Sequence, residues 1–364
     1  MSFPIPKTHK AMVYDKPGSL SLKLIDVDTP EPSFGELLVR LTHSGVCHSD
    51  FGIMTTAWSW LPRPCQSDQV GGHEGVGMVV KLGPGVKHTG TVKVGDRVGI
   101  KWISKICRQC EACLAGSDAC CLKSKISGYY TPGTFQQYTL APADYVTMIP
   151  DGVASDAAAP LLCGGVTSYA ALKKTGAIPG DWVIISGAGG GVGHLACQIG
   201  SRAMGFRILG IDANDKEILV RECGAEEFLG LNDDSQTKES IPDAVKRITG
   251  GLGAVAVIVA NGSNTAYSQG LECLRFNGTL VAVGCQEGPP VAIATATPNM
   301  FLFTQLRIIG SAVGNQKDAI EVMNLANRGV ISARRRIDKM ENLMDIFESM
   351  HNNKALGKTV IKIP

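Results

Sequence analysis

Cysteine is concentrated in one short stretch of this chain, KICRQCEACLAGSDACC, which begins at Lys105. Four of its five thiols follow the pattern C-x2-C-x2-C-x7-C, a spacing at which four thiolates can close tetrahedrally around Zn²⁺. An iron–sulfur loop of the bacterial type has a shorter final gap followed by Pro, whereas Leu122 follows here. Without a metal, such thiols would be prone to oxidation. We therefore predict a closed, structural zinc site. Its ligands are Cys107, Cys110, Cys113 and Cys121, and Cys120 stays unassigned.

A second set of metal-binding residue types is dispersed along the chain. Cys47 lies in GVCHSD, His73 in GGHEG and Cys163 in LLCGG. One imidazole and two thiolates match a catalytic zinc site that keeps its fourth position open for a substrate. Each fragment alone is weak, because free cysteines are usually buried core residues. Spacing does not join the three fragments, so this set is a hypothesis at this point.

A glycine-rich turn, SGAGGGVGHLACQ, lies between an apolar strand pattern and a helix pattern. Glycines there permit a tight turn and let the backbone approach a pyrophosphate. Asp212 follows Gly193 by 19 residues, where a carboxylate binds the ribose hydroxyls of NAD and repels the 2′-phosphate of NADP. The alternatives are an N-cap role for Asp212 and a solvated helix position for Lys216. The predicted NAD-binding residues of this segment are Gly187, Gly190, Gly191, Val192, Gly193, Asp212 and Lys216.

Two kinds of domain are needed to position these residues. From Lys10 to about residue 150, short β-type runs broken by Gly and Pro are typical of a β-rich, barrel-like domain. After Pro179, continuous apolar runs such as WVIISG and AVAVIV alternate with helix patterns, which indicates a doubly wound parallel sheet. The tail from Gln316 returns to helix and ends in an alternating strand, KTVIKI. We predict an α/β protein with domains at 1–164 and 165–312 and a C-terminal return at 313–364.

Composition limits the classes of partner. A net charge of +2 over 364 residues gives no reason to expect a nucleic acid or an anionic membrane. The apolar runs are interrupted well short of a membrane span. The start, MSFPIPKTHKAMVYDKPGS, lacks the apolar core of a signal peptide and the Arg-rich pattern of a transit peptide. We therefore expect a cytoplasmic protein, in which thiols stay reduced.

Taken together, these motifs resemble the zinc-dependent medium-chain alcohol dehydrogenases, especially the fungal enzymes of the baker's-yeast type. The resemblance runs from about Lys10 to the C-terminus and rests on GVCHSD, VGGHEGVG, the four-cysteine loop, GIKW, SGYYTPGTFQQY, LLCGG, ISGAGGGVG, AMGFRILGID and VGN. It implies a GroES-like catalytic domain, a Rossmann domain, NAD, and two Zn²⁺ per chain. The implied reaction is hydride transfer between a primary alcohol or aldehyde and the cofactor. A homo-oligomer is also implied, with a tetramer as the expected form.

The same resemblance implies roles for individual residues. Glu74 would be a near or transient zinc ligand, and Asp50 would orient the ring of His73. Ser49 matches the hydroxyl that takes the alcohol proton toward the cofactor ribose, and His48 matches a residue on the pyrophosphate. The matched catalytic residues are Cys47, His48, Ser49, Asp50, His73, Glu74 and Cys163, and the matched catalytic-zinc group is Cys47, His73, Glu74 and Cys163.

Two positions that serve the cofactor or the proton depart from the family pattern. Gly52 stands where the family's proton relay usually ends in a histidine, and no other histidine lies between His48 and His73. Either water or His48 would then complete the relay, or proton transfer would be slower. Lys358 stands where relatives carry an arginine on the phosphate, so the charge is kept and the bidentate fork is lost.

The substrate pocket is a further departure. Trp60 and Trp102 match the two tryptophans that narrow the site toward small primary alcohols, whereas Trp58 is left to core or lid packing. The stretch LPRPCQSDQV after Trp60 is more polar than the apolar segment of relatives and one residue longer. This loop and the missing histidine motivate an alternative, a dedicated reductase of an unusual aldehyde or lactol in a biosynthetic pathway.

Two alternatives from other classes are less favoured. A non-catalytic relative that kept the fold would be expected to have lost a catalytic-zinc ligand, and all three are present. A zinc-finger-like nucleic-acid module is disfavoured by the near-neutral charge and by the absence of a basic patch around the cysteine loop.

Overall fold

The computed structural model describes residues 4–231, 239–352 and 356–364, and these residues form two compact units. Unit 1 consists of Met1–Val166, Gly314–Asn327 and Arg335–Pro364. Unit 2 consists of Thr167–Val313 and Arg328–Arg334. None of the described helices is long and apolar enough to cross a membrane.

Unit 1 is built mainly from antiparallel strands. Its main sheet has the order β10-β6-β5-β3-β18-β17, with β9 also paired to β3. A smaller sheet has the order β2-β1-β4, and β7 pairs with β8. The strands are β1 (Thr8–Tyr14), β2 (Leu22–Asp28), β3 (Glu36–Val46), β4 (Gln69–Val70), β5 (Glu74–Leu82), β6 (Arg97–Ile100), β7 (Ile103–Lys105), β8 (Lys125–Ile126), β9 (Tyr138–Pro142), β10 (Thr147–Met148), β17 (Arg335–Lys339) and β18 (Lys358–Lys362).

The longest strand, β3, organises the core of unit 1. Its side chains Leu37, Val39 and Leu41 point into one buried cluster, as the two-residue period of a strand requires. Phe135 and Phe347 belong to the same cluster. The helices of this unit are α1 (His48–Met54), α2 (Val86–Thr89), α3 (Glu111–Leu114), α4 (Ser155–Ala158), α11 (Gln316–Asn327) and α12 (Leu343–His351), and α5 (Gly164–Lys173) crosses into unit 2.

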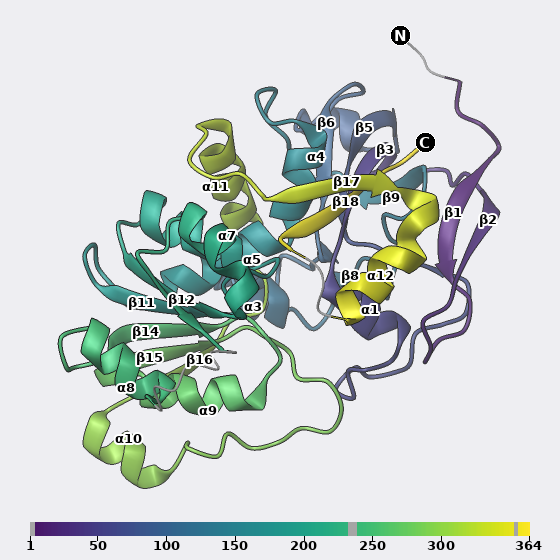
Figure 1. Ribbon diagram of the computed structural model, residues 1–364. Coiled ribbons are helices and arrows are strands. Elements are labelled where there is room, and N and C mark those ends of the chain that lie inside the picture. Colours follow the sequence, from purple (N-terminus) through teal and green to yellow (C-terminus); the bar gives the residue numbers. More distant parts are fainter. Residues whose placement is uncertain (1–3, 232–238, 353–355) are drawn as a thin grey trace. The chain divides into compact units, whose positions relative to one another are not determined.

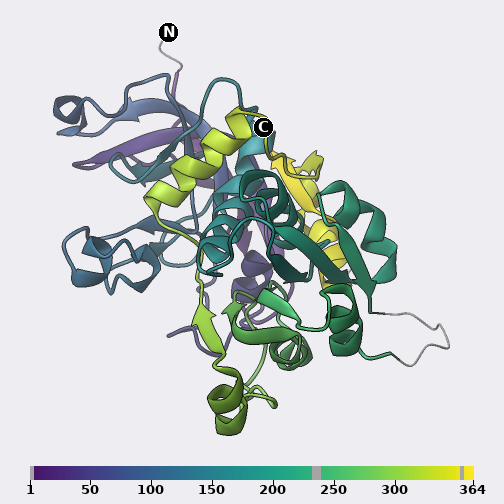
Figure 2. The same ribbon diagram turned by 90° about the vertical axis from the view of Figure 1, so that its left-hand side faces the viewer.

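Unit 2 contains a parallel sheet with the strand order β13-β12-β11-β14-β15-β16 (Figures 1 and 2). The order reverses between β11 and β14, which is the topology of a doubly wound nucleotide-binding fold. Every residue of β14 is buried, in agreement with its continuous apolar run. The structure therefore confirms the predicted parallel sheet. Its strands are β11 (Trp182–Ser186), β12 (Arg207–Asp212), β13 (Glu227–Gly230), β14 (Ala254–Val259), β15 (Leu274–Ala282) and β16 (Arg307–Gly310).

Helices cover both faces of this sheet. Figure 1 shows α7 on one side and α8 and α9 on the other. The helix predicted from about Lys216 to Cys223 is α7, which spans Glu217–Glu222. The helices of unit 2 are α6 (Gly193–Gln198), α7 (Glu217–Glu222), α8 (Ile241–Ile248), α9 (Asn264–Glu272) and α10 (Pro298–Thr304), and α6 runs on into a π-helical turn at Ile199–Ala203.

Candidate functional site

The fold brings the dispersed metal-binding residues of unit 1 together. One ligand atom from each of Cys47, His73, Glu74 and Cys163 lies within 4.8 Å of the others. Cys47 follows the end of β3, and His73 and Glu74 stand at the start of β5. Cys163 comes directly before α5. The antiparallel register of β3 and β5, which pairs Gly45 with Glu74, places the first three residues side by side.

Asp50 fixes the orientation of the His73 ring. Its Oδ1 accepts a hydrogen bond from His73 Nδ1 at 2.7 Å, and its Oδ2 accepts one from the backbone N–H of Cys47 at 3.0 Å. The first bond leaves the lone pair on Nε2 of His73, because a neutral imidazole carries one proton. This Nε2 is fully buried and has no hydrogen-bond partner among the residues that the structure describes.

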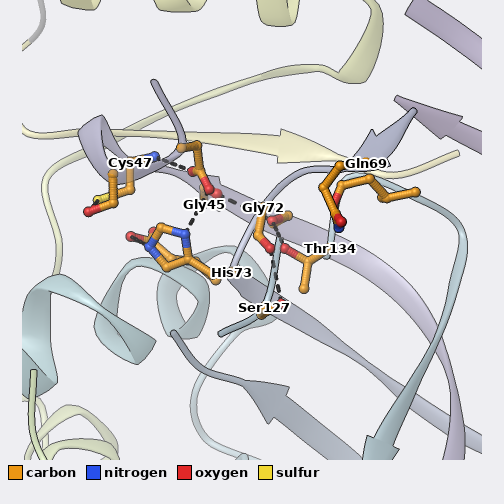
Figure 3. A network of polar contacts seen from close by, with 12 residues as sticks. Gly45, Cys47, Gln69, Gly72, His73, Ser127 and Thr134 are labelled. Carbon is orange, nitrogen blue, oxygen red and sulfur yellow. Dashed lines mark hydrogen bonds and ion pairs between the residues drawn. The ribbon is translucent and has the colours of Figure 1, made fainter. Parts of the chain in front are cut away.

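A buried imidazole nitrogen with its lone pair facing two thiols fits a divalent cation. Zn²⁺ accepts nitrogen and sulfur ligands, and the carboxylate behind the ring is the arrangement that orients zinc-binding histidines. Figure 3 shows Cys47 and His73 beside the turn at Gly72, which has a φ of 92°. The Gly72 carbonyl accepts hydrogen bonds from Ser127 Oγ and from the backbone N–H of Thr134, so the approach to His73 is rigidly braced.

Glu74 is fully buried and forms an ion pair with Lys358. Oε1 of Glu74 accepts from Nζ of Lys358, whereas Oε2 has no hydrogen-bond partner within the described parts of the chain. Burial raises the pKa of Glu74 to about 7, although Lys358 acts in the opposite direction. A Cβ at Gly45 would lie 1.9 Å from Oε2 of Glu74, so glycine at 45 makes room for this carboxylate.

The structure therefore places Lys358 inside unit 1, at the candidate catalytic cluster of Cys47, His73, Glu74 and Cys163. Its side chain is 4% exposed and is paired with a carboxylate. The sequence predicts a contact between this lysine and a cofactor phosphate, which is a different partner. Pairing of β18 with β3, through Thr359 and Val46, brings Lys358 to this position.

The charges around the two thiols favour one thiolate even before a metal binds. The Cys163 thiol and Lys358 lower the pKa of Cys47 well below its usual value. The same contact with Cys47, together with burial, raises the pKa of Cys163. Burial alone would lower the pKa of His73, but Asp50 and Cys47 raise it to about 10. Cys47 thus favours the thiolate, whereas the raised pKa values keep protons on His73 and Cys163 that a bound cation would displace.

Two further predicted residues lie on the first turn of α1. Ser49 Oγ lies 3.7 Å from Sγ of Cys47, within reach of a group bound at the cluster. His48 is exposed, and its ring centroid lies 5.4 Å from that of Phe51. The other side of Phe51 stacks on His351 at 5.2 Å.

The four spaced cysteines also converge, in a lobe that projects from the rest of unit 1 (Figure 2). Their sulfur atoms lie within 4.8 Å of one another, and none of the four belongs to a disulfide. Three of these cysteines are half-buried and Cys121 is buried, whereas the adjacent Cys120 is exposed and stands outside the cluster. Four thiolates would fill all four positions of a tetrahedral zinc site and leave none open for a substrate, as the sequence predicts.

A buried polar network attaches this lobe to the body of unit 1. Asp118, inside the lobe, accepts from Tyr145 OH at 2.6 Å and from the backbone N–H of Gln316 at 3.0 Å. Lys101 donates to the Tyr145 carbonyl at 2.8 Å and to Oε1 of Gln316 at 2.5 Å. Burial lowers the pKa of Lys101 to about 7.

In unit 2 the glycine-rich turn joins β11 to α6 at the switch point of the sheet. Gly187 has a φ of 82°, and a Cβ at Gly193 would lie 2.0 Å from the Gly187 carbonyl oxygen. Asp212, at the end of β12, accepts from the backbone N–H of Gly189 at 2.8 Å. Its other oxygen lies 3.1 Å from Nζ of Lys216. The turn, the carboxylate and the lysine are therefore together, as a dinucleotide site requires. Gly190, Gly191 and Val192 complete this turn.

Three tryptophan rings form a series of contacts that ends at His73. Trp58 is buried, with its ring centroid 5.4 Å from that of Trp60 and 6.1 Å from that of Trp102. Trp102 in turn packs edge-on against His73 at 4.8 Å. Trp60 is 56% exposed. Trp102 is thus the ring that contacts the cluster, and Trp58 is buried behind it, in agreement with the core packing expected from the sequence.

Trp58 also explains Gly52. A Cβ at Gly52 would lie 2.9 Å from the indole ring of Trp58, a separation that real side chains do not adopt. A histidine at this position would therefore displace Trp58. The indole takes the space in which the family's relay histidine would begin.

Comparisons with known proteins agree with this geometry. The chain matches the family models described as "Alcohol dehydrogenase GroES-like domain" over residues 33–151 and "Zinc-binding dehydrogenase" over residues 191–328. Alcohol dehydrogenase 2 of Emericella nidulans is 55% identical over 362 residues, which cover 99% of this chain and 98% of that protein. An alcohol dehydrogenase of Schizosaccharomyces pombe is 38% identical and covers 99% of both. The chain belongs to the zinc-dependent medium-chain alcohol dehydrogenases.

Solved structures of similar chains confirm the GroES-like and Rossmann folds. An alcohol dehydrogenase from Aeropyrum pernix has a TM-score of 0.85 at 26% identity, and the match covers 98% of this chain and all of that one. An acetophenone reductase from Geotrichum candidum, in complex with NAD, has a TM-score of 0.83 at 29% identity and covers 99% and 98%. This alcohol dehydrogenase is zinc- and NAD-dependent, and the comparisons support the alcohol-oxidising activity rather than the dedicated reductase.

Some residues of the alcohol dehydrogenase escape sequence reasoning altogether. Lys101 and Asp118 are buried ionisable residues, and although Lys101 lies in GIKW and Asp118 in the four-cysteine loop, neither motif indicates their role. His194 and Gln198 of α6 are both buried, although their helix begins at a predicted cofactor turn. In the sequence, these residues could have been noticed only as polar residues within apolar stretches.

Proposed function

We propose that this alcohol dehydrogenase converts small primary alcohols to aldehydes, and the reverse, at a zinc held by Cys47, His73 and Cys163. One observation carries the proposal, namely the buried Nε2 of His73, which lies beside two thiols and has no hydrogen-bond partner among the described residues. A zinc ion at these ligands supplies a Lewis acid for the substrate oxygen. Trp102, which packs edge-on against His73 with Trp58 next to it, would bound the substrate pocket and favour small alcohols.

The residues around the ligands prepare the site for this chemistry. Asp50 holds a ring proton of His73 on Nδ1, so that Nε2 is the nitrogen that would bind the zinc. Ser49, 3.7 Å from Sγ of Cys47, accepts the proton that leaves the alcohol. Because Trp58 fills the place next to Gly52, this proton leaves by way of water or His48 rather than through a side chain at 52.

Glu74 and Lys358 form a charge pair behind the ligands. A carboxylate oxygen of Glu74 lies within 4.8 Å of the other ligand atoms, close enough for Glu74 to serve as a transient fourth protein ligand. Lys358 balances the negative charge that two thiolates and a carboxylate place in a buried site. We propose this charge balance as the main role of Lys358, and contact with a cofactor phosphate as a second one.

We propose NAD rather than NADP as the preferred cofactor, bound at the turn of unit 2. The carboxylate of Asp212 stands at the end of β12, where it would accept hydrogen bonds from ribose hydroxyls and repel a 2′-phosphate. The glycines at 187 and 193 leave the backbone of the turn accessible to a pyrophosphate.

A second, structural zinc is proposed for the four-cysteine lobe. Four thiolates provide a closed set, so that this metal stabilises the loop and takes no part in the reaction. The two-zinc count follows from the two convergent clusters, one with an open position and one without.

A homo-oligomer, with a tetramer as the expected form, is proposed from the edge of the unit 2 sheet. β16 is an edge strand, and Ile308 on it is exposed. The neighbouring α10 has no buried residue among its seven, and its Leu302 and Phe303 are exposed. An apolar strand edge of this kind is normally covered by another chain.

The remaining proposals concern organisation and location. We keep the division into domains at 1–164 and 165–312 with a return at 313–364, because chain segments of similar extent make up the two units. A cytoplasmic location is supported by the free cysteines, which include exposed Cys120 and Cys285.

Steady-state rates with NAD⁺ and NADP⁺ over straight-chain, aromatic and polar alcohols test the proposal directly. Expected are NAD-linked turnover of ethanol to butanol and two Zn²⁺ per chain by elemental analysis. An enzyme with two zinc ions that oxidises none of these small alcohols would contradict the proposed substrate class. An enzyme with one zinc would contradict the proposed lobe site.

A further inference from the structure

A short strap of chain, Arg328–Arg334, belongs to unit 2 although the segments on both sides of it belong to unit 1. Ile331 and Ala333 of the strap are buried, while the side chains of Ser332 and Arg334 are exposed. Backbone groups of the strap form hydrogen bonds within unit 2. Their partners are two buried polar side chains of α6.

Gln198 binds the strap as a neighbouring strand would. Its Nε2 donates to the Ser332 carbonyl at 3.0 Å, and its Oε1 accepts from the backbone N–H of Ser332 at 3.0 Å. Nη1 of Arg202 donates to the same Oε1 at 3.1 Å, which agrees with this orientation of the amide. The side chain of Gln198 is 2% exposed, so these bonds are shielded from water.

His194, one helical turn earlier, joins the same strap to the glycine-rich turn. Its Nε2 accepts from the backbone N–H of Arg334 at 3.1 Å. Because Nε2 accepts, the ring proton is on Nδ1, which lies 2.8 Å from the Gly190 carbonyl oxygen. One fully buried ring thus connects the turn at Gly190 with the strap at Arg334.

At the end of the strap, two consecutive arginines form ion pairs in different units. The Arg334 guanidinium pairs with Glu222 of α7, in unit 2. The Arg335 guanidinium pairs with Asp156 of α4 at 2.6 Å, in unit 1. The boundary between the two units therefore falls at the peptide bond between Arg334 and Arg335.

We propose that His194 and Gln198 are positioning residues that couple dinucleotide binding at the turn to the strap. The buried ring of His194 is hydrogen-bonded to both the turn and the strap, and Gln198 holds the strap on the same helix, so ordering one of them orders the other. By linkage, restraint of the strap must then tighten cofactor binding to the same degree. The π-helical turn that follows Gln198 is a feature often found at functional positions of helices. This inference rests on the proposed NAD-binding site.

Three variants of the full-length, zinc-loaded enzyme test the coupling. His194→Asn keeps a donor near the Gly190 carbonyl and removes the acceptor for the Arg334 N–H. Gln198→Leu keeps the volume and removes both bonds to Ser332. Arg334→Ala is the matched control, because it removes the ion pair with Glu222 and keeps the backbone N–H.

NADH affinity is measured by fluorescence titration, and hydride transfer is measured in single turnovers at saturating cofactor. We expect His194→Asn and Gln198→Leu to weaken NADH binding about tenfold, the range of a typical coupling between sites. Arg334→Ala should change the affinity by less than about twofold, and hydride transfer should stay within about twofold in all three. A merely structural role would lower the melting temperature and leave NADH affinity unchanged, and that result overturns the inference.

Hydrogen exchange on the unmodified enzyme tests the coupling even if a variant fails to fold. NADH should slow exchange in a peptide that covers residues 328–336, where the Ser332 and Arg334 amides are bound by α6. If NADH binds and the exchange of this peptide is unchanged, the coupling is wrong and the proposed function stands. If the enzyme does not bind NADH at all, both are overturned.

Discussion

The two cysteine clusters of unit 1 are built in opposite ways. The four cysteines of the lobe come from one loop, and three of them are half-buried. The catalytic cluster takes Cys47, His73 and Cys163 from three separated elements, and the last two are buried. In the lobe the local chain path brings the ligands together, whereas at the catalytic cluster the register of β3 and β5 does so.

The side chains around the two clusters also differ. Three buried ionisable residues lie at the catalytic cluster, namely Asp50, Glu74 and Lys358. In the lobe, the thiols are supported by one another and by backbone groups, such as the N–H of Cys107 directed at Sγ of Cys121. Buried ionisable side chains contact the Cys47 cluster directly through His73 and Glu74, whereas in the lobe Asp118 and Lys101 form the attachment to the body of unit 1.

Removal of a catalytic ligand is expected to have the largest effect. Cys163→Ala should lower kcat/KM for ethanol by about 10³-fold or more, because the Lewis acid contributes several kcal/mol to the transition state. Zinc content should fall from two ions per chain to one. The control is Cys273→Ala, another buried cysteine that lies in the core of unit 2, and it should retain activity within about twofold. Retention of activity by Cys163→Ala would show that Cys163 is not a ligand.

A change in the lobe should affect stability before it affects chemistry. Cys107→Ser is expected to lower the thermal midpoint by roughly 10 °C, because a structural zinc contributes to folding directly. The kcat per folded molecule should remain within about twofold. Thermal unfolding and active-site titration separate the two quantities. Cys120→Ser, which changes the exposed neighbour of the cluster, should alter neither, and an equal loss in both variants would disprove the assignment of the ligands.

The attachment of the lobe should be visible as a pH dependence of stability. Burial lowers the pKa of Lys101 to about 7, from an ordinary value of 10.5. Between these values the unfolded chain binds a proton that the folded chain does not, so the stability of the wild type rises with pH relative to Lys101→Met. The slope of this difference is at most about 1.4 kcal/mol per pH unit, and it vanishes below pH 7. Urea unfolding at several pH values measures it, with exposed Lys105→Met as control. A flat difference above pH 7 would contradict the prediction.

The smallest expected effect distinguishes the buried tryptophan from the exposed one. Trp58→Ala should shift the ratio of kcat/KM for butanol over ethanol about tenfold toward butanol, because a few methylene groups of pocket volume are worth this much. Trp60→Ala, with its ring half in solvent, should change the ratio by less than about twofold. Competition experiments with both alcohols measure the ratio. An equal shift in both variants would show that the exposed ring also lines the pocket.

Sequence reasoning succeeds where contacts are local. The spacing of the four lobe cysteines predicts a cluster, and the structure brings their sulfur atoms together. Apolar runs separated by helix patterns predict the parallel sheet, because a strand that is buried on both faces has no polar positions. The dispersed site could be assembled from sequence only through its resemblance to a family.

Other features depend on pairing between distant segments, which no pattern encodes. Lys358 meets Glu74 because β18 adds to β3, and the two residues are 284 positions apart. Trp58 and Trp60 are separated by one residue, and only the path of the loop decides which ring is buried. His194 reads in the sequence as part of a cofactor turn, and its bond to the strap appears only in three dimensions.

The position of β18 has a consequence for synthesis of the enzyme. β18 lies between β3 and β17 in the main sheet of unit 1, although it follows both of them in the sequence. A growing chain emerges from the ribosome from its N-terminal end, so unit 2 has nearly all of its residues available while that sheet still lacks its C-terminal members. A nascent chain can therefore form the four-cysteine lobe early. It completes the surroundings of the proposed catalytic ligands, with Lys358 beside Glu74, only after β18 has been made.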